Sequence, residues 1–234
     1  MRVALILPGL TRSAKICYDS LNKYLLSHYD VDIYIHTWDV SNVSLDASVS
    51  EREIEINELE ELYKPKKLVV EKYFDKRPLL IEKYKNYPKL QGTWERSMSM
   101  FYKLEECFNL IEDDYDMIIR SRMDIMFYNK VELEKLNNSS INIPLYQSDR
   151  ETQIIDGIAY SIPHDSYGIL DCFSVGNYEN MKKYCNVYTN LDKMCLQMGF
   201  SYHPEHIQLR NLEIQSAPVS RFDLDFSLVR KPNK

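Results

Sequence analysis

The sequence predicts an α/β fold with a mostly parallel central sheet flanked by helices, and three observations predict it. Residues 3–7 form a continuous apolar run, which suits a strand buried on both faces of a parallel sheet. An amphipathic helix and a second apolar strand follow within the first forty residues, as in a strand–helix–strand unit. Later in the chain a long amphipathic helix leads into another apolar strand at residues 116–120.

The first strand ends at Pro8-Gly9, and Ser13 is expected to cap the helix that follows. The apolar side chains of that helix recur at helical spacing, which gives it one buried face. The second strand is predicted at residues 31–36. Because open sheets of this kind bind ligands at the carboxyl ends of their strands, the loops at residues 8–12 and 37–39 are predicted to line a binding site.

The remaining elements are predicted from apolar periodicity and from cap residues. A polar, Ser-rich stretch at residues 41–53 is expected to form a surface loop that acts as a lid. Nothing marks a domain boundary, so a single domain spanning 1–234 is expected. Strands are predicted at 67–71 and 168–175, and helices at 57–63, at 94–111 with Thr93 as cap, as a pair over 177–198, and from Pro204 to Leu212.

Composition narrows the class of protein. A hydrophobic fraction of 44% and a charged fraction of 27% are typical of a soluble globular protein. The net charge of -6 argues against a nucleic-acid partner. The five Cys residues are widely spaced and odd in number, which favours reduced, buried thiols. The short apolar run at the N-terminus lacks a cleavage site, so neither a signal peptide nor a membrane span is expected, and the predicted location is the cytoplasm.

The end of the strand at residues 116–120 holds the main candidates for ligand binding and catalysis. Two arginines and a carboxylate, Arg120, Arg122 and Asp124, follow an apolar strand, and strand alternation would place all three on one side. A guanidinium group suits a phosphate, and Asp124 could bind a divalent cation that bridges diphosphate oxygens. An ion pair between these groups, with no role in catalysis, is the alternative interpretation.

The two earlier loops supply further candidates. Gly9 allows the backbone to approach a ligand, and Thr11 and Arg12 could hold an anion together with the amides of the next helix. Trp38 could stack on a base and Asp39 could accept ribose hydroxyls. An ordinary solvated turn and simple core packing of Trp38 are the competing interpretations.

Five motifs, taken in order, resemble small glycosyltransferases of the GT-A fold, found in bacterial polysaccharide loci and large DNA viruses. They are Ile6-Leu-Pro-Gly-Leu-Thr-Arg12, Val31-Asp-Ile-Tyr-Ile-His-Thr-Trp-Asp39, Ser99-Met-Phe-Tyr-Lys103, Tyr115-Asp-Met-Ile-Ile-Arg-Ser-Arg-Met-Asp124 and Phe173-Ser-Val-Gly-Asn177. The resemblance implies a Rossmann-type GT-A domain that moves a sugar from a nucleoside diphosphate, UDP most of all, to a hydroxyl of a glycan or glycoprotein acceptor. It also implies a part in polysaccharide biosynthesis, in the cytoplasm of a host cell if the chain is viral.

In this family an Asp-x-Asp motif holds Mn²⁺ or Mg²⁺ against the diphosphate. The matching positions here are Arg122-Met-Asp124, so the first acid is replaced and metal dependence is in question. The literal Asp114-Tyr-Asp116 precedes its strand and is interpreted as part of an exposed turn.

The resemblance implies roles for further residues. Gln91 and Lys103 bracket the helix that would lie beside the donor site. Asp171 and its rival Asp156 are candidate catalytic carboxylates, since an acid in this half of the family's fold touches the sugar or the acceptor. The same comparison implies a late metal ligand and a late catalytic acid, here His203 and Glu205; Glu205 is equally explained by the helix dipole.

Two other functions remain open at this stage. A nucleotide- or glycan-binding module would keep the pocket without catalysis. A nucleotidyl- or phosphotransferase could use the same Arg and Asp cluster, although the sequence lacks a Gly-rich loop that ends in Gly-Lys-Ser/Thr.

Overall fold

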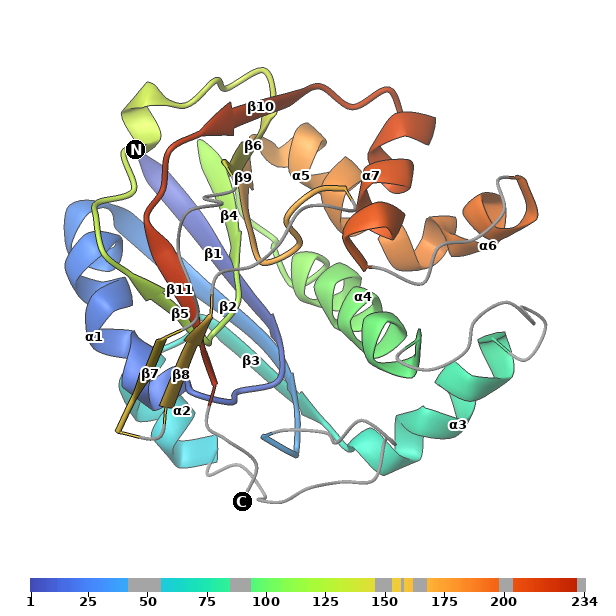
Figure 1. The fold of residues 1–234 in the computed structure, drawn as a ribbon, viewed down its shortest axis with the longest axis horizontal. Helices are drawn as coiled ribbons and strands as arrows, with labels where there is room; N and C mark the ends of the chain where they lie inside the picture. The colour runs from blue at the N-terminus through green and yellow to red at the C-terminus, as the bar shows by residue number, and fades with distance from the viewer. Residues whose placement is uncertain are drawn as a thin grey trace.

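The computed structural model describes residues 1–41, 56–84, 94–145, 153–156, 158–161, 168–197 and 204–230. Its centre is a seven-stranded sheet with the order β10-β6-β9-β4-β1-β2-β3 (Figure 1). Every pairing in this sheet is parallel except those of β9 with β4 and β6. The prediction of an α/β fold with a mostly parallel central sheet is therefore confirmed.

The central strands are short, and those in the middle of the sheet are apolar and buried. The side chains of β1 are buried from Val3 onward, as the continuous apolar run predicts for a strand covered on both faces. The strands are β1 (Arg2–Gly9), β2 (Asp30–Trp38), β3 (Lys67–Glu71), β4 (Met117–Ser121), β6 (Ile141–Pro144), β9 (Phe173–Gly176) and β10 (Val219–Phe222).

Helices cover both faces of the sheet (Figure 1). On one side lie α1 and α2, while α4 packs on β1 and β2 from the other side, next to α5, α6 and α7. The helices are α1 (Ala14–Tyr24), α2 (Ile56–Tyr63), α3 (Tyr73–Tyr84), α4 (Trp94–Phe108), α5 (Tyr178–Cys185), α6 (Val187–Gln197) and α7 (Pro204–Ile214), with short 3-10 turns at η1 (Leu26–His28) and η2 (Leu133–Lys135).

A second, four-stranded sheet has no counterpart in the sequence prediction. Its order is β5-β11-β8-β7, and all of its pairings are antiparallel. The strands have only three to five residues, too few for an alternating pattern to stand out: β5 (Ile125–Phe127), β7 (Gln153–Ile155), β8 (Ile158–Ser161) and β11 (Phe226–Arg230).

Three local expectations are corrected. The hydroxyl of Ser13 does not cap α1; it donates to the carbonyl of Val229, which ties α1 to β11. The strand expected at 168–175 begins only at Phe173, so Asp171 precedes it. Strand β4 ends at Ser121, so the alternation that would align Arg120 with Asp124 stops before Asp124.

The strand order places a topological switch point between β1 and β4. From β1 the chain adds β2 and then β3 on one side, and it returns to the other side of β1 with β4. Ligands of open α/β sheets bind in the crevice at the carboxyl ends of the strands at such a point. The loops after β1 and β4, which contain Arg12 and Asp124, meet there.

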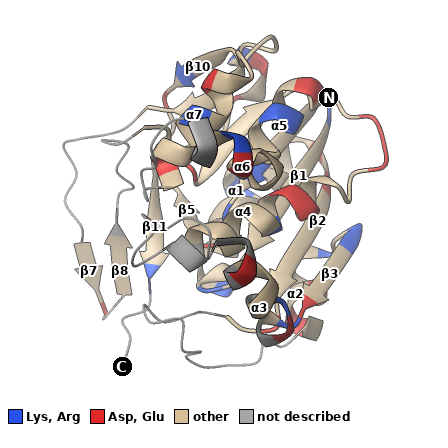
Figure 2. Cartoon of the chain, turned by 90° about the vertical axis from the view of Figure 1, so that its right-hand side faces the viewer, with Lys and Arg blue, Asp and Glu red and all other residues tan. Residues whose placement is uncertain are grey.

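The surface is of mixed charge. Figure 2 shows Lys and Arg on β3, α5 and β10, interspersed with Asp and Glu instead of gathered on one element. Over the described ranges, no helix is both long enough and apolar enough to cross a membrane. Four of the five cysteines, Cys17, Cys107, Cys172 and Cys185, are buried free thiols.

Candidate functional site

Asp124 is the centre of the site at the switch point. Its carboxylate is buried, and three arginines donate to it. Arg122 binds both oxygens at 2.9 Å, while Arg12 and Arg230 donate to Oδ2 at 3.1 and 2.5 Å. Burial alone would raise the pKa of Asp124, but the three guanidinium groups hold it well below its ordinary value. The carboxylate is therefore ionised at every physiological pH.

The three arginines come from distant parts of the sequence. Arg12 lies in the loop after β1, Arg122 follows β4, and Arg230 is the last residue of β11. Burial and the like charges of Arg122 and Arg12 lower the pKa of Arg230, whereas Asp124 raises it. Asp124 by itself therefore balances only one of the three guanidinium charges of this arginine cluster.

The loop after β1 is held in an uncommon backbone conformation. Arg12 has φ 41 and Gly9 has φ 98. A left-handed conformation is costly for a residue other than Gly, and such strain gathers at functional sites. A side chain at Gly9 would meet no atom within 4 Å, so open space adjoins this backbone. The amide of Arg12 donates to the carbonyl of Ser41, which fixes the loop.

Two further carboxyl groups, Asp171 and Glu205, lie beside the arginine cluster. Burial, and then the negative charge of Asp171, raise the pKa of Glu205 to about 7, while Arg122 acts in the opposite direction. Asp171 is buried just before β9 and also interacts electrostatically with Arg122 and Arg230. Glu205 is thus a carboxyl group that exchanges a proton near neutral pH.

Gly168 brings these two carboxyl groups together. The amide of Ile169 donates to the carbonyl of Glu205 at 3.1 Å, which joins the segment before β9 to the first turn of α7. A Cβ atom at Gly168 would lie closer than 3.0 Å to the backbone of Glu205. Only Gly allows the two segments to pack at this distance.

Lys103 and Trp38 form a second polar cluster, at the carboxyl ends of β2 and β3. Lys103 is fully buried on α4, where it donates to Glu71 at 2.8 Å and lies 3.7 Å from the centre of the Trp38 ring. Burial lowers the pKa of Lys103 to about 8, although Glu71 opposes the shift. Trp38 itself donates to Ser99 and stacks on Tyr102. Trp38 is therefore a buried core residue, which is the competing interpretation that the sequence left open.

Glu71 was not among the candidates from the sequence, although it ends a strand that the sequence predicts correctly. Burial would raise its pKa, but Lys103 and Lys76 bind it and hold the value at about 2. His36 lies 3.1 Å from Glu71, and burial followed by the charge of Lys103 lowers the pKa of His36 to about 4. The sequence offered one signal for Glu71, because it is an acidic residue at the end of a predicted parallel strand.

Asp39 has a structural partner in this region. Its side chain accepts a hydrogen bond from the amide of Tyr73, which is the first residue of α3, at a distance of 3.0 Å. A carboxylate in that position satisfies a helix amide that would otherwise lack a partner. The predicted contact of Asp39 with a ribose stays a prediction.

Arg120 is separate from the arginine cluster in its described contacts. It is almost completely buried in β4, and its Nε and Nη1 atoms have no hydrogen-bond partner. Ser174, its partner across the pairing with β9, also has a buried hydroxyl without one. Within the ranges the structure describes, Arg120 pairs with no carboxylate.

The other candidates are placed as follows. Thr11 is buried, and its carbonyl accepts from the amide of Ala14 at the start of α1. Asp156 is exposed, with φ 50, in the turn that joins β7 to β8, a position that Asp tolerates for local reasons. Gln91 and His203, and most of the expected lid at 41–53, lie outside the described residues.

A divalent cation does not fit the donors at Asp124. Both carboxylate oxygens already accept hydrogen bonds from guanidinium groups, so a metal would have to displace them against three nearby positive charges. Across the described parts of the chain, no group of three or more His, Cys, Asp and Glu side chains is arranged to hold a metal ion.

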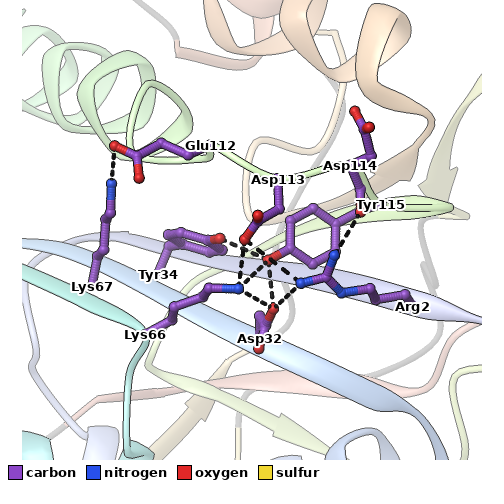
Figure 3. Close-up of polar contacts among 9 residues, drawn as sticks. All are labelled: Arg2, Asp32, Tyr34, Lys66, Lys67, Glu112, Asp113, Asp114 and Tyr115. Atoms are coloured by element: carbon purple, nitrogen blue, oxygen red, sulfur yellow. Dashed lines mark hydrogen bonds and ion pairs between the residues drawn. The ribbon is translucent and has the colours of Figure 1, made fainter.

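The literal Asp114-Tyr-Asp116 lies at the opposite edge of the sheet, where β1 and β4 begin (Figure 3). Figure 3 shows Lys66 between Asp32 and Asp113, with Arg2 and Tyr115 bound to the same Asp32. Asp113 and Asp114 are exposed, as expected for the turn between α4 and β4. Arg2 and Lys66 each pair with both Asp32 and Asp113, so this edge of the sheet is an ion-pair network.

Comparison with known proteins does not assign the chain. No model of a known protein family matches it, and no curated protein matches its sequence significantly.

Proposed function

We propose that this chain is a GT-A-type glycosyltransferase, a single domain that moves a sugar from a nucleoside diphosphate, UDP most of all, to a hydroxyl of a glycan or glycoprotein. One observation carries the proposal. A cluster of three arginines around the buried Asp124 lies at the switch point of an α/β sheet, beside Glu205, whose pKa is raised to about 7. The five motifs quoted above, in their order along the chain, support the same class.

The arginine cluster suits the leaving group. When the bond between the anomeric carbon and the diphosphate oxygen breaks, negative charge develops on the diphosphate. Guanidinium groups fixed before the reaction stabilise that charge without reorganisation in the transition state. Arg122 is anchored by two hydrogen bonds to Asp124, which fixes the plane of its guanidinium group.

Glu205 suits the role of general base. The acceptor oxygen forms the new bond to the anomeric carbon, and its proton passes to the carboxylate of Glu205. A base is most effective when its pKa lies near the working pH, and burial beside Asp171 gives Glu205 such a value. Asp171 then orients the transferred sugar. This assignment implies inversion at the anomeric carbon, since direct displacement needs a base for the acceptor.

The test is the release of UDP from a panel of UDP-sugars, with and without oligosaccharide acceptors, and with mass spectrometry of the product. We expect slow release without acceptor and faster release with the right acceptor. In Glu205→Gln the acceptor-dependent rate should fall by about 10²–10⁴-fold. Asp113→Asn, the same kind of change at the opposite edge of the sheet, is the control and should keep the rate.

Other outcomes would replace the proposal. Tight binding of UDP-sugars without any release of UDP would make the chain a binding module. Preference for nucleoside triphosphates, with release of pyrophosphate, would make it a nucleotidyltransferase.

A further inference from the structure

We propose that the arginine cluster binds the diphosphate group of its ligand without a divalent cation, and that Asp124 is the positioning residue that holds Arg12, Arg122 and Arg230 in place. The inference rests on the proposed function, because it takes a nucleoside diphosphate as the natural ligand. It departs from the metal role that the resemblance implies for Asp124.

The first argument is the use of the carboxylate oxygens. Oδ1 of Asp124 accepts from Nε of Arg122, and Oδ2 accepts from three guanidinium nitrogens on Arg12, Arg122 and Arg230. Mg²⁺ and Mn²⁺ bind oxygens that are free to coordinate at short distance. Four guanidinium donors thus surround this carboxylate, three on Oδ2 and one on Oδ1, so a metal ion at Oδ2 would have to displace arginines that the carboxylate orients.

The second argument is charge. A dication at Asp124 would join three guanidinium groups within hydrogen-bond distance of the same carboxylate, a strongly repulsive arrangement. A diphosphate has the opposite effect, because its negative charge attracts the guanidinium groups that share the single carboxylate of Asp124. Arginine also matches phosphate geometry with paired, parallel hydrogen bonds. The cluster thus supplies the positive charge that a metal would otherwise provide.

The third argument is exposure. The Asp124 side chain is only 1% exposed, whereas those of Arg122, Arg12 and Arg230 are 14%, 27% and 35% exposed. The carboxylate lies beneath, and the guanidinium groups extend from it towards solvent. The loop that carries Arg12 also has open space at Gly9, where a Cβ atom would meet nothing within 4 Å.

The experiment is titration calorimetry on the whole chain with inorganic pyrophosphate and with UDP, once in excess EDTA and once in Mn²⁺. We expect both probes to bind in EDTA, with a change of about twofold at most when Mn²⁺ is added. The analysis corrects for the complex that Mn²⁺ forms with each probe in solution. Binding that requires Mn²⁺ and disappears in EDTA would overturn the inference.

Variants of Arg230, the most exposed of the three arginines, leave Arg12 and Arg122 bound to Asp124. Arg230→Gln should weaken pyrophosphate binding in EDTA by about ten- to a hundredfold, the range for one charge-assisted hydrogen bond. Arg230→Lys retains the charge and should recover part of that loss. Arg2→Gln removes an exposed arginine at the opposite edge and should leave binding unchanged. Equal affinities for wild type and Arg230→Gln would also overturn the inference.

The outcomes separate this inference from the proposed function. Binding of UDP in EDTA without release of UDP from any UDP-sugar would support the metal-free site and count against glycosyl transfer. Release of UDP that depends on Mn²⁺ would support glycosyl transfer and contradict the metal-free site.

Discussion

Asp124→Asn tests the arrangement at the switch point most directly. The substitution keeps the shape of the side chain but removes a negative charge that all three arginines of the cluster contact. Removing one partner of a buried ion pair costs about 3–5 kcal/mol, because the other partner is left buried without compensation. For a chain of this length, at about 2–4 °C per kcal/mol, we expect Tm to fall by about 6–20 °C.

The pH dependence follows from the depressed pKa of Asp124. A carboxylate whose pKa is lowered in the folded state stabilises the protein at any pH above the pKa that it has in the unfolded chain, which is about 4. This stabilisation is lost progressively as the pH falls below that value. The difference in stability between wild type and Asp124→Asn should therefore be constant around neutral pH and should shrink only in acid. Thermal unfolding followed by circular dichroism measures it.

Pyrophosphate supplies the second readout. Without the carboxylate the three guanidinium groups are no longer held in position for a diphosphate, so the variant should bind pyrophosphate more weakly. In EDTA, pyrophosphate should therefore raise the Tm of Asp124→Asn by less than it raises that of wild type. Asp113→Asn is the matched control, since that exposed carboxylate pairs with Lys66 and Arg2 at the surface, where ion pairs contribute little to stability. A Tm for Asp124→Asn within about 2 °C of wild type would refute the reasoning.

Three further predictions follow from the neighbouring groups. The acceptor-dependent rate of wild type should rise as the pH passes through about 7, because Glu205 acts as a base only when ionised, and Glu205→Gln should lose this rise in the pH–rate profile. Gly168→Ala places a Cβ atom against the backbone of Glu205, so it should lower the free energy of unfolding in denaturant by about 1–3 kcal/mol and should also lower the rate. In the control Gly176→Ala the new Cβ meets neighbours only at 3.3 Å or more, so the loss of stability should be smaller. Equal losses in the two variants would contradict the packing argument. In Lys103→Met the pKa of His36 should rise above about 4 in an NMR titration, because a nearby positive charge is removed while burial remains, and an unchanged value would show that Lys103 does not act on His36.

Sequence reasoning predicted much of the central sheet. β3 was predicted with its observed bounds, and β1 and β2 to within a few residues at each end, because buried parallel strands are continuous apolar runs. The segment at 168–172 was misassigned because it is equally apolar: its residues pack in the core without pairing as a strand. Periodicity reports burial, and it does not report which backbone groups are paired.

The candidate site, like the sheet, was predicted only in part from the sequence. The sequence indicated Arg12, Arg122 and Asp124, since charges that follow apolar strands must meet a ligand or one another. It gave no sign of Arg230, which is 106 residues from Asp124 and ends a strand of the small sheet. It placed Lys103 beside the donor site, and it gave no indication that tertiary packing buries this lysine against Trp38.

The sequence by itself therefore determined the class of fold and the edge of the sheet at which charged residues gather, because both follow from local patterns of apolar and polar residues. Only the tertiary structure decided which charges meet. Three arginines converge on Asp124, and the contact at Gly168 brings Asp171 beside Glu205. These arrangements depend on strand order and on contacts between distant segments, and such contacts leave no local pattern in the chain.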